Sequence, residues 1–122
     1  MEFSPQVAYY VVRFHSHLMN DAERKAQLHL LATMKATRGR SDETAQHEAQ
    51  NNKIYSRMLS TEPNVLSLAK DGSEQLQLTT AARILKDSAD KVFFNCCPAC
   101  GELARTPSAR QCRYCGYDWH GT

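Results

Sequence analysis

Four cysteines near the end of the chain have a spacing suited to binding a metal ion. They occur in two short segments, CPACG at residues 97–101 and CRYCG at residues 112–116. Two thiols three positions apart, with a glycine directly after the second, allow a tight turn that aims both sulfurs at one ion while backbone N–H groups point toward them. Two such turns predict a tetrahedral site for one structural Zn²⁺, with four ligands: Cys97, Cys100, Cys112 and Cys115.

Two further side chains near this site need an assignment. Cys96 stands directly before the first turn, and using it as a ligand would lengthen the spacing and lose the turn geometry of residues 97–101. We therefore expect a free or packed thiol at Cys96. His120 could replace one cysteine, but four thiolates already complete a tetrahedron, so we expect that His120 is not a ligand.

Cysteine usage also bears on the compartment and on the class of chemistry. The chain has five cysteines, and paired CxxC spacing fits metal binding in a reducing compartment better than a disulfide framework, which predicts a cytoplasmic protein. A redox CxxC normally occurs singly at a strand-to-helix junction, whereas two copies here follow a helical pattern. Thiol-redox chemistry is therefore the less favoured alternative.

No enzyme motif accompanies the cysteines. The sequence contains no glycine-rich phosphate loop, nucleophile elbow or HExxH segment. In the helical part, Glu43 and His47 are the only acid and histidine four positions apart within one predicted helix, and solvated side chains are the favoured interpretation. We expect no catalytic residues and no enzyme activity.

A helical part must position the metal site, and its first two helices have clear starts. Ser4 followed by Pro5 predicts a helix over about residues 5–19. Its apolar positions repeat at helical spacing: Val7, Val11, Phe14 and Leu18. Asn20, with Glu23 three positions on, predicts the capping box of a second helix, which ends near Gly39.

Three more helices are expected before the cysteines. A third can start at Ser41 and is anchored by Tyr55, Met58 and Leu59. The segment from Val65 to Leu78 admits two interpretations, since a glycine turn flanked by leucines also matches a β-hairpin. We favour a short helix that stops at Asp71-Gly72, followed by a last helix from Ser73 to about residues 93–95.

The predicted fold class is therefore mainly α. An N-terminal helical bundle of four to five helices occupies residues 1–95, and a small four-cysteine zinc module occupies residues 96–122. So short a module buries too little apolar surface to fold without help, so metal binding should supply the missing stability.

Composition and charge give weaker guidance about partners. The chain is 42% hydrophobic and 23% charged, as in ordinary globular proteins, and no apolar run is long enough for a transmembrane helix. The net charge is +2, with the basic excess in the first 40 positions. Four thiolates outweigh Zn²⁺, so the loaded module has about one net negative charge, which weakens a purely electrostatic case for nucleic acid.

The segments CPACG and QCRYCG, with a spacer of 11 residues (101–111) between Cys100 and Cys112, resemble zinc-ribbon or rubredoxin-knuckle modules. This resemblance implies that the four knuckle cysteines are the ligands. The longer pattern of residues 103–107, 111–112 and 116–120 resembles the tail of an uncharacterised bacterial family with a helical body and a C-terminal zinc ribbon, and it implies no activity.

The favoured function is a non-enzymatic zinc-binding protein that acts as a protein-interaction or adaptor module. The two middle residues of a CxxC turn project away from the ion, which predicts a partner-binding surface of cationic and aromatic side chains: Arg105, Arg110, Arg113 and Tyr114. A regulatory zinc-ribbon protein that binds nucleic acid is the alternative. We also hypothesise a homodimer through the stripe of the first helix, whose competing use is packing within the chain.

Overall fold

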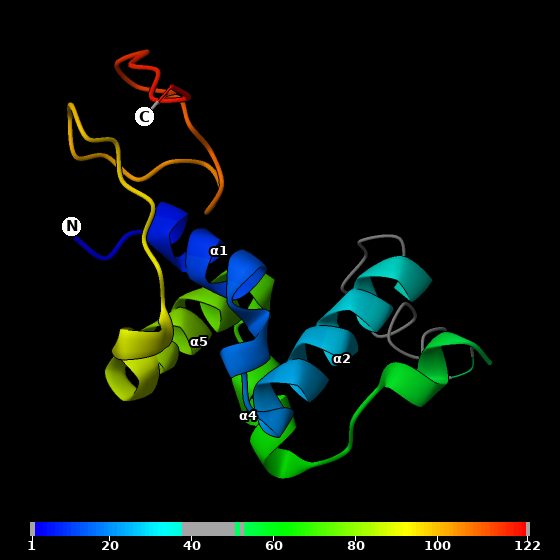
Figure 1. Ribbon diagram of the computed structural model, residues 1–122. Helices are drawn as coiled ribbons and strands as arrows, with labels where there is room; N and C mark the ends of the chain where they lie inside the picture. The colour runs from blue at the N-terminus through cyan, green and yellow to red at the C-terminus, as the bar shows by residue number, and fades with distance from the viewer. Residues whose placement is uncertain (1, 38–50, 52, 122) are drawn as a thin grey trace. The chain divides into compact units, whose positions relative to one another are not determined.

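A computed structural model describes residues 2–37, 51 and 53–121. The chain is mainly helical over these residues, and an irregular segment with the four cysteines follows the helices (Figure 1), so the predicted fold class is confirmed. The described elements are α1 (Pro5–Phe14), η1 (Ser16–Leu18), α2 (Asp21–Thr37), η2 (Tyr55–Met58), α4 (Pro63–Ala69), α5 (Gly72–Ser88) and η3 (Ala89–Lys91), where η denotes a 3-10 turn. None of the described helices combines the length and hydropathy of a membrane span.

The predicted third helix starts at Ser41, which lies outside the described residues. Of its anchoring residues, Tyr55 and Met58 bound the 3-10 turn η2, and Leu59 follows that turn in extended conformation. The pair Glu43 and His47 also lies outside the described residues.

The start of α1 follows the prediction, but its end does not. The Val7 N–H donates to the Ser4 side-chain hydroxyl at 3.2 Å, and Pro5 occupies the first helical turn. The helix then stops at Phe14 instead of continuing to residue 19, because His15 leaves the helical conformation (φ −127°). Its buried ring instead bonds the backbone of Phe93.

The chain separates into two compact units. The α1 unit comprises residues 1–18 and 78–122, and the α2 unit comprises residues 19–77, with the division falling inside α5. The knuckles thus belong to the same compact unit as α1. The predicted boundary near residue 95 states that residues 1–95 and 96–122 fold independently, and it stays a prediction.

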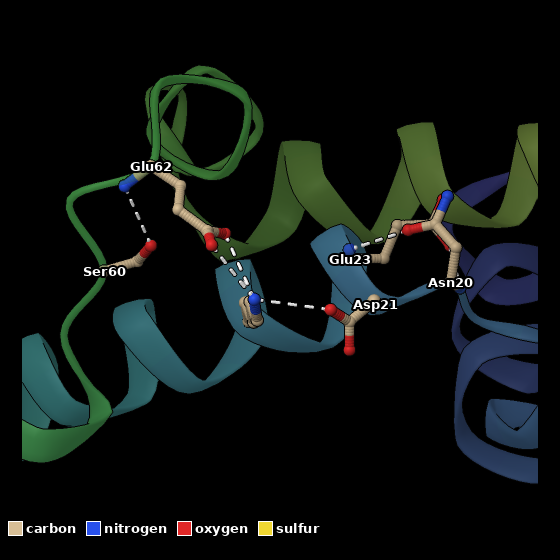
Figure 2. Close-up of polar contacts among 6 residues, drawn as sticks. Asn20, Asp21, Glu23, Ser60 and Glu62 are labelled. Atoms are coloured by element: carbon tan, nitrogen blue, oxygen red, sulfur yellow. Dashed lines mark hydrogen bonds and ion pairs between the residues drawn. The ribbon is translucent and has the colours of Figure 1, made fainter.

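The predicted capping box opens the α2 unit. The Asn20 N–H donates to Glu23 Oε1 at 2.8 Å, and the Glu23 N–H donates to Asn20 Oδ1 at 2.9 Å. Figure 2 shows Asn20 and Glu23, together with Asp21 and Glu62, whose carboxylates lie 3.3 Å and 3.1 Å from the Lys25 ammonium. The box satisfies two backbone donors that a helix start leaves unpaired.

Helices α2 and α4 contact each other and form the core of the α2 unit. One buried apolar cluster in this core consists of Ala26, Val65 and Ala69 together with Leu76 of α5. The segment Val65–Leu78 is helical on both sides of Gly72, whose φ is +91°. The hairpin alternative is therefore wrong: a short turn at Lys70 and Asp71 follows α4, and the left-handed Gly72 is the first residue of α5.

Helix α1 and the C-terminal half of α5 both contribute buried residues to the α1 unit. On α1, Val7 and Val11 are buried within the chain. A homodimer stays a prediction, but this stripe is already used in packing. On α5, Thr80, Ala81 and Ile84 are buried, and the Arg83 guanidinium donates to the Leu18 carbonyl at 2.8 Å.

The last helix also ends earlier than predicted. Helix α5 stops at Ser88 and a single 3-10 turn follows, after which Val92 is extended. Phe93 and Asn95 then form hydrogen bonds with the side chains of Tyr10, on α1, and His15, directly after α1. Backbone groups used in this way are not free for a helix, so the prediction of a helix to residues 93–95 is wrong.

Candidate metal centre

The first knuckle is a tight turn closed by backbone hydrogen bonds. The Cys97 N–H donates to the Glu102 carbonyl at 2.8 Å, and the Gly101 N–H donates to the Cys97 carbonyl at 2.9 Å. One step outward, the Ala104 N–H donates to the Asn95 carbonyl at 2.8 Å. These bonds fold residues 95–104 back on themselves and place the two sulfurs of the turn on one side.

The second knuckle repeats this pattern 15 positions later in the sequence. The Cys112 N–H donates to the Tyr117 carbonyl at 2.8 Å, and the Gly116 N–H donates to the Cys112 carbonyl at 3.1 Å. The Trp119 N–H donates to the Arg110 carbonyl at 2.8 Å. Every donor and acceptor has its counterpart in the first turn, so the chain builds the same half-site twice.

Each knuckle needs its glycine for backbone conformation. Gly101 has a φ of +80° and Gly116 a φ of +78°, in the left-handed region that side chains disfavour. A Cβ added at either glycine would meet nothing within 4 Å, so space is not the constraint. The sequence argument for glycine after each second cysteine is therefore confirmed.

The two half-sites bring all four predicted ligands together. The Sγ atoms of Cys97, Cys100, Cys112 and Cys115 all lie within 4.8 Å of one another. Across the two knuckles, Cys97 and Cys115 are 3.7 Å apart, and Cys100 and Cys112 are 3.5 Å apart. Four thiolates at about 2.3 Å from a tetrahedral zinc would be about 3.8 Å from one another, so the sulfurs have the spacing that such an ion needs.

Backbone N–H groups point at the sulfur of the first cysteine in each knuckle. The Ala99 N–H donates to Cys97 Sγ at 3.4 Å. In the second knuckle the N–H groups of Tyr114 and Cys115 donate to Cys112 Sγ at 3.3 and 3.4 Å. Such donors stabilise a thiolate, which is the form of cysteine that binds a metal.

The thiols differ widely in acidity within the cluster. The pKa of Cys112 is lowered to about 6, mainly by the backbone N–H of Cys115, against the opposing effect of burial. The pKa of Cys100 is raised to about 12, because burial and the neighbouring thiols outweigh the backbone N–H of Glu102, which lowers it. The thiols therefore do not all ionise together at neutral pH, so a metal that binds all four as thiolates must displace protons.

The site is half buried and half exposed. Cys97 and Cys112 are buried, at 2% and 3% exposure, and pack with Ala104 and Trp119. The second cysteine of each knuckle is exposed. The apolar cluster is small, which agrees with a module that depends on its metal.

Residues that the sequence did not single out tie this module to α1. The Tyr10 hydroxyl donates to the Phe93 carbonyl at 2.8 Å and accepts from the Asn95 N–H at 3.2 Å. The Asn95 side-chain amide then donates to the carbonyls of Thr106 and Ala109, at 2.9 and 2.8 Å, in the spacer. Tyr10 shares the apolar face of Val7 and Val11, so its burial was readable, but its hydrogen-bond partners were not.

His15 adds a third contact with the same segment. Its Nε2 accepts from the Phe93 N–H at 3.2 Å, so this nitrogen carries no proton. Burial, with a smaller effect of His17, lowers the pKa of His15 and favours this neutral form. The buried Nδ1 has no hydrogen-bond partner among the described residues.

The alternative ligands lie outside the sulfur cluster. Neither Cys96 nor His120 belongs to the metal-binding group, and Cys96 is a half-buried free thiol. His120 instead contacts Asp118, with 2.6 Å between Nδ1 and Oδ1. Across the part of the chain that the structure describes, the four cysteines are the only such group of histidine, cysteine or acidic side chains.

The four residues predicted to bind a partner are all exposed, and their joint role in binding stays a prediction. Arg105 and Arg113 line the same pocket, whereas Arg110 does not. The Arg113 guanidinium lies over the Tyr114 ring, 5.1 Å from its centroid. The Gln6 side-chain amide donates to the Tyr114 hydroxyl, which connects the second knuckle to α1.

The chain matches no protein-family profile, no curated protein and no solved structure. The interpretation of this site as a metal centre therefore depends on the sulfur geometry and the two repeated turns.

Proposed function

We propose that this protein is a non-enzymatic zinc-binding protein whose four-cysteine module holds one structural Zn²⁺ and supports a surface for a protein partner. The observation that carries the proposal is the convergence of four sulfurs within 4.8 Å on two matching turns. Four thiolates at tetrahedral spacing suit Zn²⁺ better than Mg²⁺ or Ca²⁺, which prefer oxygen ligands.

A structural role for the metal follows from the number of ligands. Catalytic zinc keeps an open position for water or substrate, whereas four protein ligands complete the tetrahedron. The bound ion would supply binding energy for folding, and the knuckles would hold the spacer and its arginines in place. This supports a binding protein more than an enzyme.

A protein partner is the favoured ligand of the surface. The exposed large aromatic side chains of the described residues all belong to the α1 unit: Phe3, Tyr9, Phe93, Tyr114 and Tyr117. Tyrosine and arginine are enriched among the residues that dominate binding energy at protein interfaces. Nucleic acid remains the second candidate, because an arginine lying over an exposed tyrosine is also a platform for stacking a base.

A pull-down with the zinc-loaded chain tests the proposal. We expect proteins that stay bound after nuclease treatment and that are lost from a bait stripped of metal. The double variant Arg113→Ala with Tyr114→Ala should keep its zinc and lose these partners. Capture that disappears with nuclease would favour the nucleic-acid alternative, and full capture by the double variant would move the binding surface elsewhere.

A further inference from the structure

A pocket of about 310 Å³ lies within the α1 unit, where α1 faces the spacer and the second knuckle. Helix α1 contributes three aromatic side chains to its lining, Tyr9, Tyr10 and Phe14. Arg105 and Arg113 line it from the C-terminal module. The pocket therefore combines an aromatic wall from a helix with a cationic wall whose position depends on the metal site.

The charge of the pocket is one-sided. Arg105 and Arg113 are its only charged lining residues, and no carboxylate lines it. The Arg113 guanidinium is positioned by the Tyr114 ring, and Tyr114 in turn bonds Gln6, another lining residue. Two guanidinium groups without an acidic neighbour favour an anionic ligand, and the planar fork of arginine suits a carboxylate.

The size and polarity of the pocket favour the end of a polypeptide as ligand over a continuous nucleic-acid strand. Its volume is at the lower limit of ligand pockets, which run from about 300 Å³ to about 1,000 Å³. A single-stranded nucleic acid needs a groove that tracks several phosphates, and only two cations line this pocket. A terminal carboxylate beside one apolar side chain needs one anion site and one apolar site, as found here.

We propose that this pocket binds the free C-terminal carboxylate of a partner protein whose last residue is aromatic or a large aliphatic. Arg105 and Arg113 hold the carboxylate, and the ring of Tyr9 packs against the last side chain. The inference rests on the proposed function as a protein-interaction module, and it names the part of the partner that is recognised.

The test compares two peptides with the full-length, zinc-loaded protein. The probes are a fluorescent hexapeptide that ends in phenylalanine with a free carboxylate and the same peptide with an amidated end, measured by anisotropy. We expect the free acid to bind at least about tenfold more tightly, because a hydrogen bond to a charged group contributes more than one to a neutral group. Arg105→Ala should remove about the same factor.

Two variants separate the pocket from general charge and from misfolding. Lys86→Ala removes one positive charge from an exposed position of α5 in the same unit, outside the pocket, and it should leave peptide affinity unchanged. Tyr9→Ala truncates a ring that is 52% exposed. This variant should therefore bind the peptide more weakly, without loss of zinc or of the helical circular dichroism signal. Each variant is compared at equal metal content.

Several results would overturn the inference. The first is equal affinity of the protein for the free acid and the amide, or no binding of the free acid at millimolar peptide concentration. The second is the same loss of peptide affinity in Lys86→Ala as in Arg105→Ala. The third is displacement of the peptide by a short oligothymidylate that binds more tightly. If the pull-down captures protein partners but peptide affinity does not depend on the terminal carboxylate, this inference is wrong and the proposed function stands. A bait that captures no protein would sink the proposed function.

Discussion

The Asn95 N–H donates to the Tyr10 hydroxyl at 3.2 Å, which joins the first helix to the residue two positions before the first metal ligand. The same hydroxyl donates to the Phe93 carbonyl at 2.8 Å. Tyr10 is 2% exposed, so its hydroxyl is largely shielded from water. One side chain thus holds the backbone that leads into the first knuckle.

The variant Tyr10→Phe should therefore destabilise the protein while preserving the metal site. It keeps the ring and removes the partner of two partly buried backbone groups, the Phe93 carbonyl and the Asn95 N–H, which we expect to cost about 1 kcal/mol. Urea unfolding of the zinc-loaded protein measures the change. Tyr9→Phe, at the exposed neighbouring position, is the matched control and should change stability by less than about 0.5 kcal/mol. Equal effects of the two variants would contradict a role for the Tyr10 hydroxyl.

The register of the cysteines can be tested by metal analysis. Cys112→Ser should lose zinc, because it removes a ligand whose Sγ lies 3.5 Å from that of Cys100. Cys96→Ser should keep one zinc per chain, because Cys96 lies outside the sulfur cluster. Mass spectrometry of the intact protein under native conditions measures both, and the reverse result would show that the assigned ligands are wrong.

The left-handed glycines predict a dependence of metal affinity on backbone conformation. Gly101→Ala places a side chain at a φ of +80°, which costs about 1–2 kcal/mol and should weaken zinc binding about tenfold in competition with a chromophoric chelator. Gly121→Ala, at a described glycine without a left-handed φ, is the control. Equal affinity of the two variants would show that the turn tolerates a side chain.

Acid should destabilise the α2 unit through His29. The Ser60 N–H donates to His29 Nδ1 at 3.0 Å, and burial lowers the pKa of His29 below its usual 6.5. The unfolded chain therefore takes up a proton before the folded chain does. This contribution to stability is present above pH 6.5 and decreases as the pH falls from 6.5 through the lowered pKa.

The measurement for His29 is urea unfolding between pH 7.5 and pH 5.5. His29→Gln should be less stable at pH 7.5 and should show a shallower decrease toward pH 5.5 than the original protein. Because His29 lies in the other compact unit from the cysteines, loss of metal in acid affects both proteins equally. Parallel pH profiles would rule out His29 as a source of the acid sensitivity.

Removal of the metal tests the predicted boundary at residue 95. Chelation should unfold residues 96–122 and leave most of the helical signal, because α2 and α4 have an apolar core of their own. Far-UV circular dichroism before and after chelation measures the helical content. Loss of most of that signal would mean that the hydrogen bonds from Tyr10 and His15 make the helices and the module a single cooperative structure.

The sequence by itself determined the features that depend on neighbouring residues. The Ser4 cap, the capping box of Asn20 and Glu23, and the two CxxCG turns each involve groups within about five positions, so their chemistry is readable from spacing. The clustering of the four sulfurs follows once both turns form, because two half-sites complete one tetrahedron. The turn signal at Asp71 and Gly72 is also local, so helices on both sides of Gly72 could be favoured over a hairpin from the sequence.

Only the tertiary structure decided where the outer helices end and which exposed side chains meet. Helix α1 ends at Phe14 and α5 ends at Ser88, and beyond these ends the side chains of His15 and Tyr10 bond the backbone of Phe93 and Asn95. Helical spacing carries no information about partners so distant in the sequence. The pocket that joins Arg105 and Arg113 to the aromatic side chains of α1 depends on the same packing. Arg110 is also an arginine of the spacer, as Arg105 is, yet it does not line the pocket.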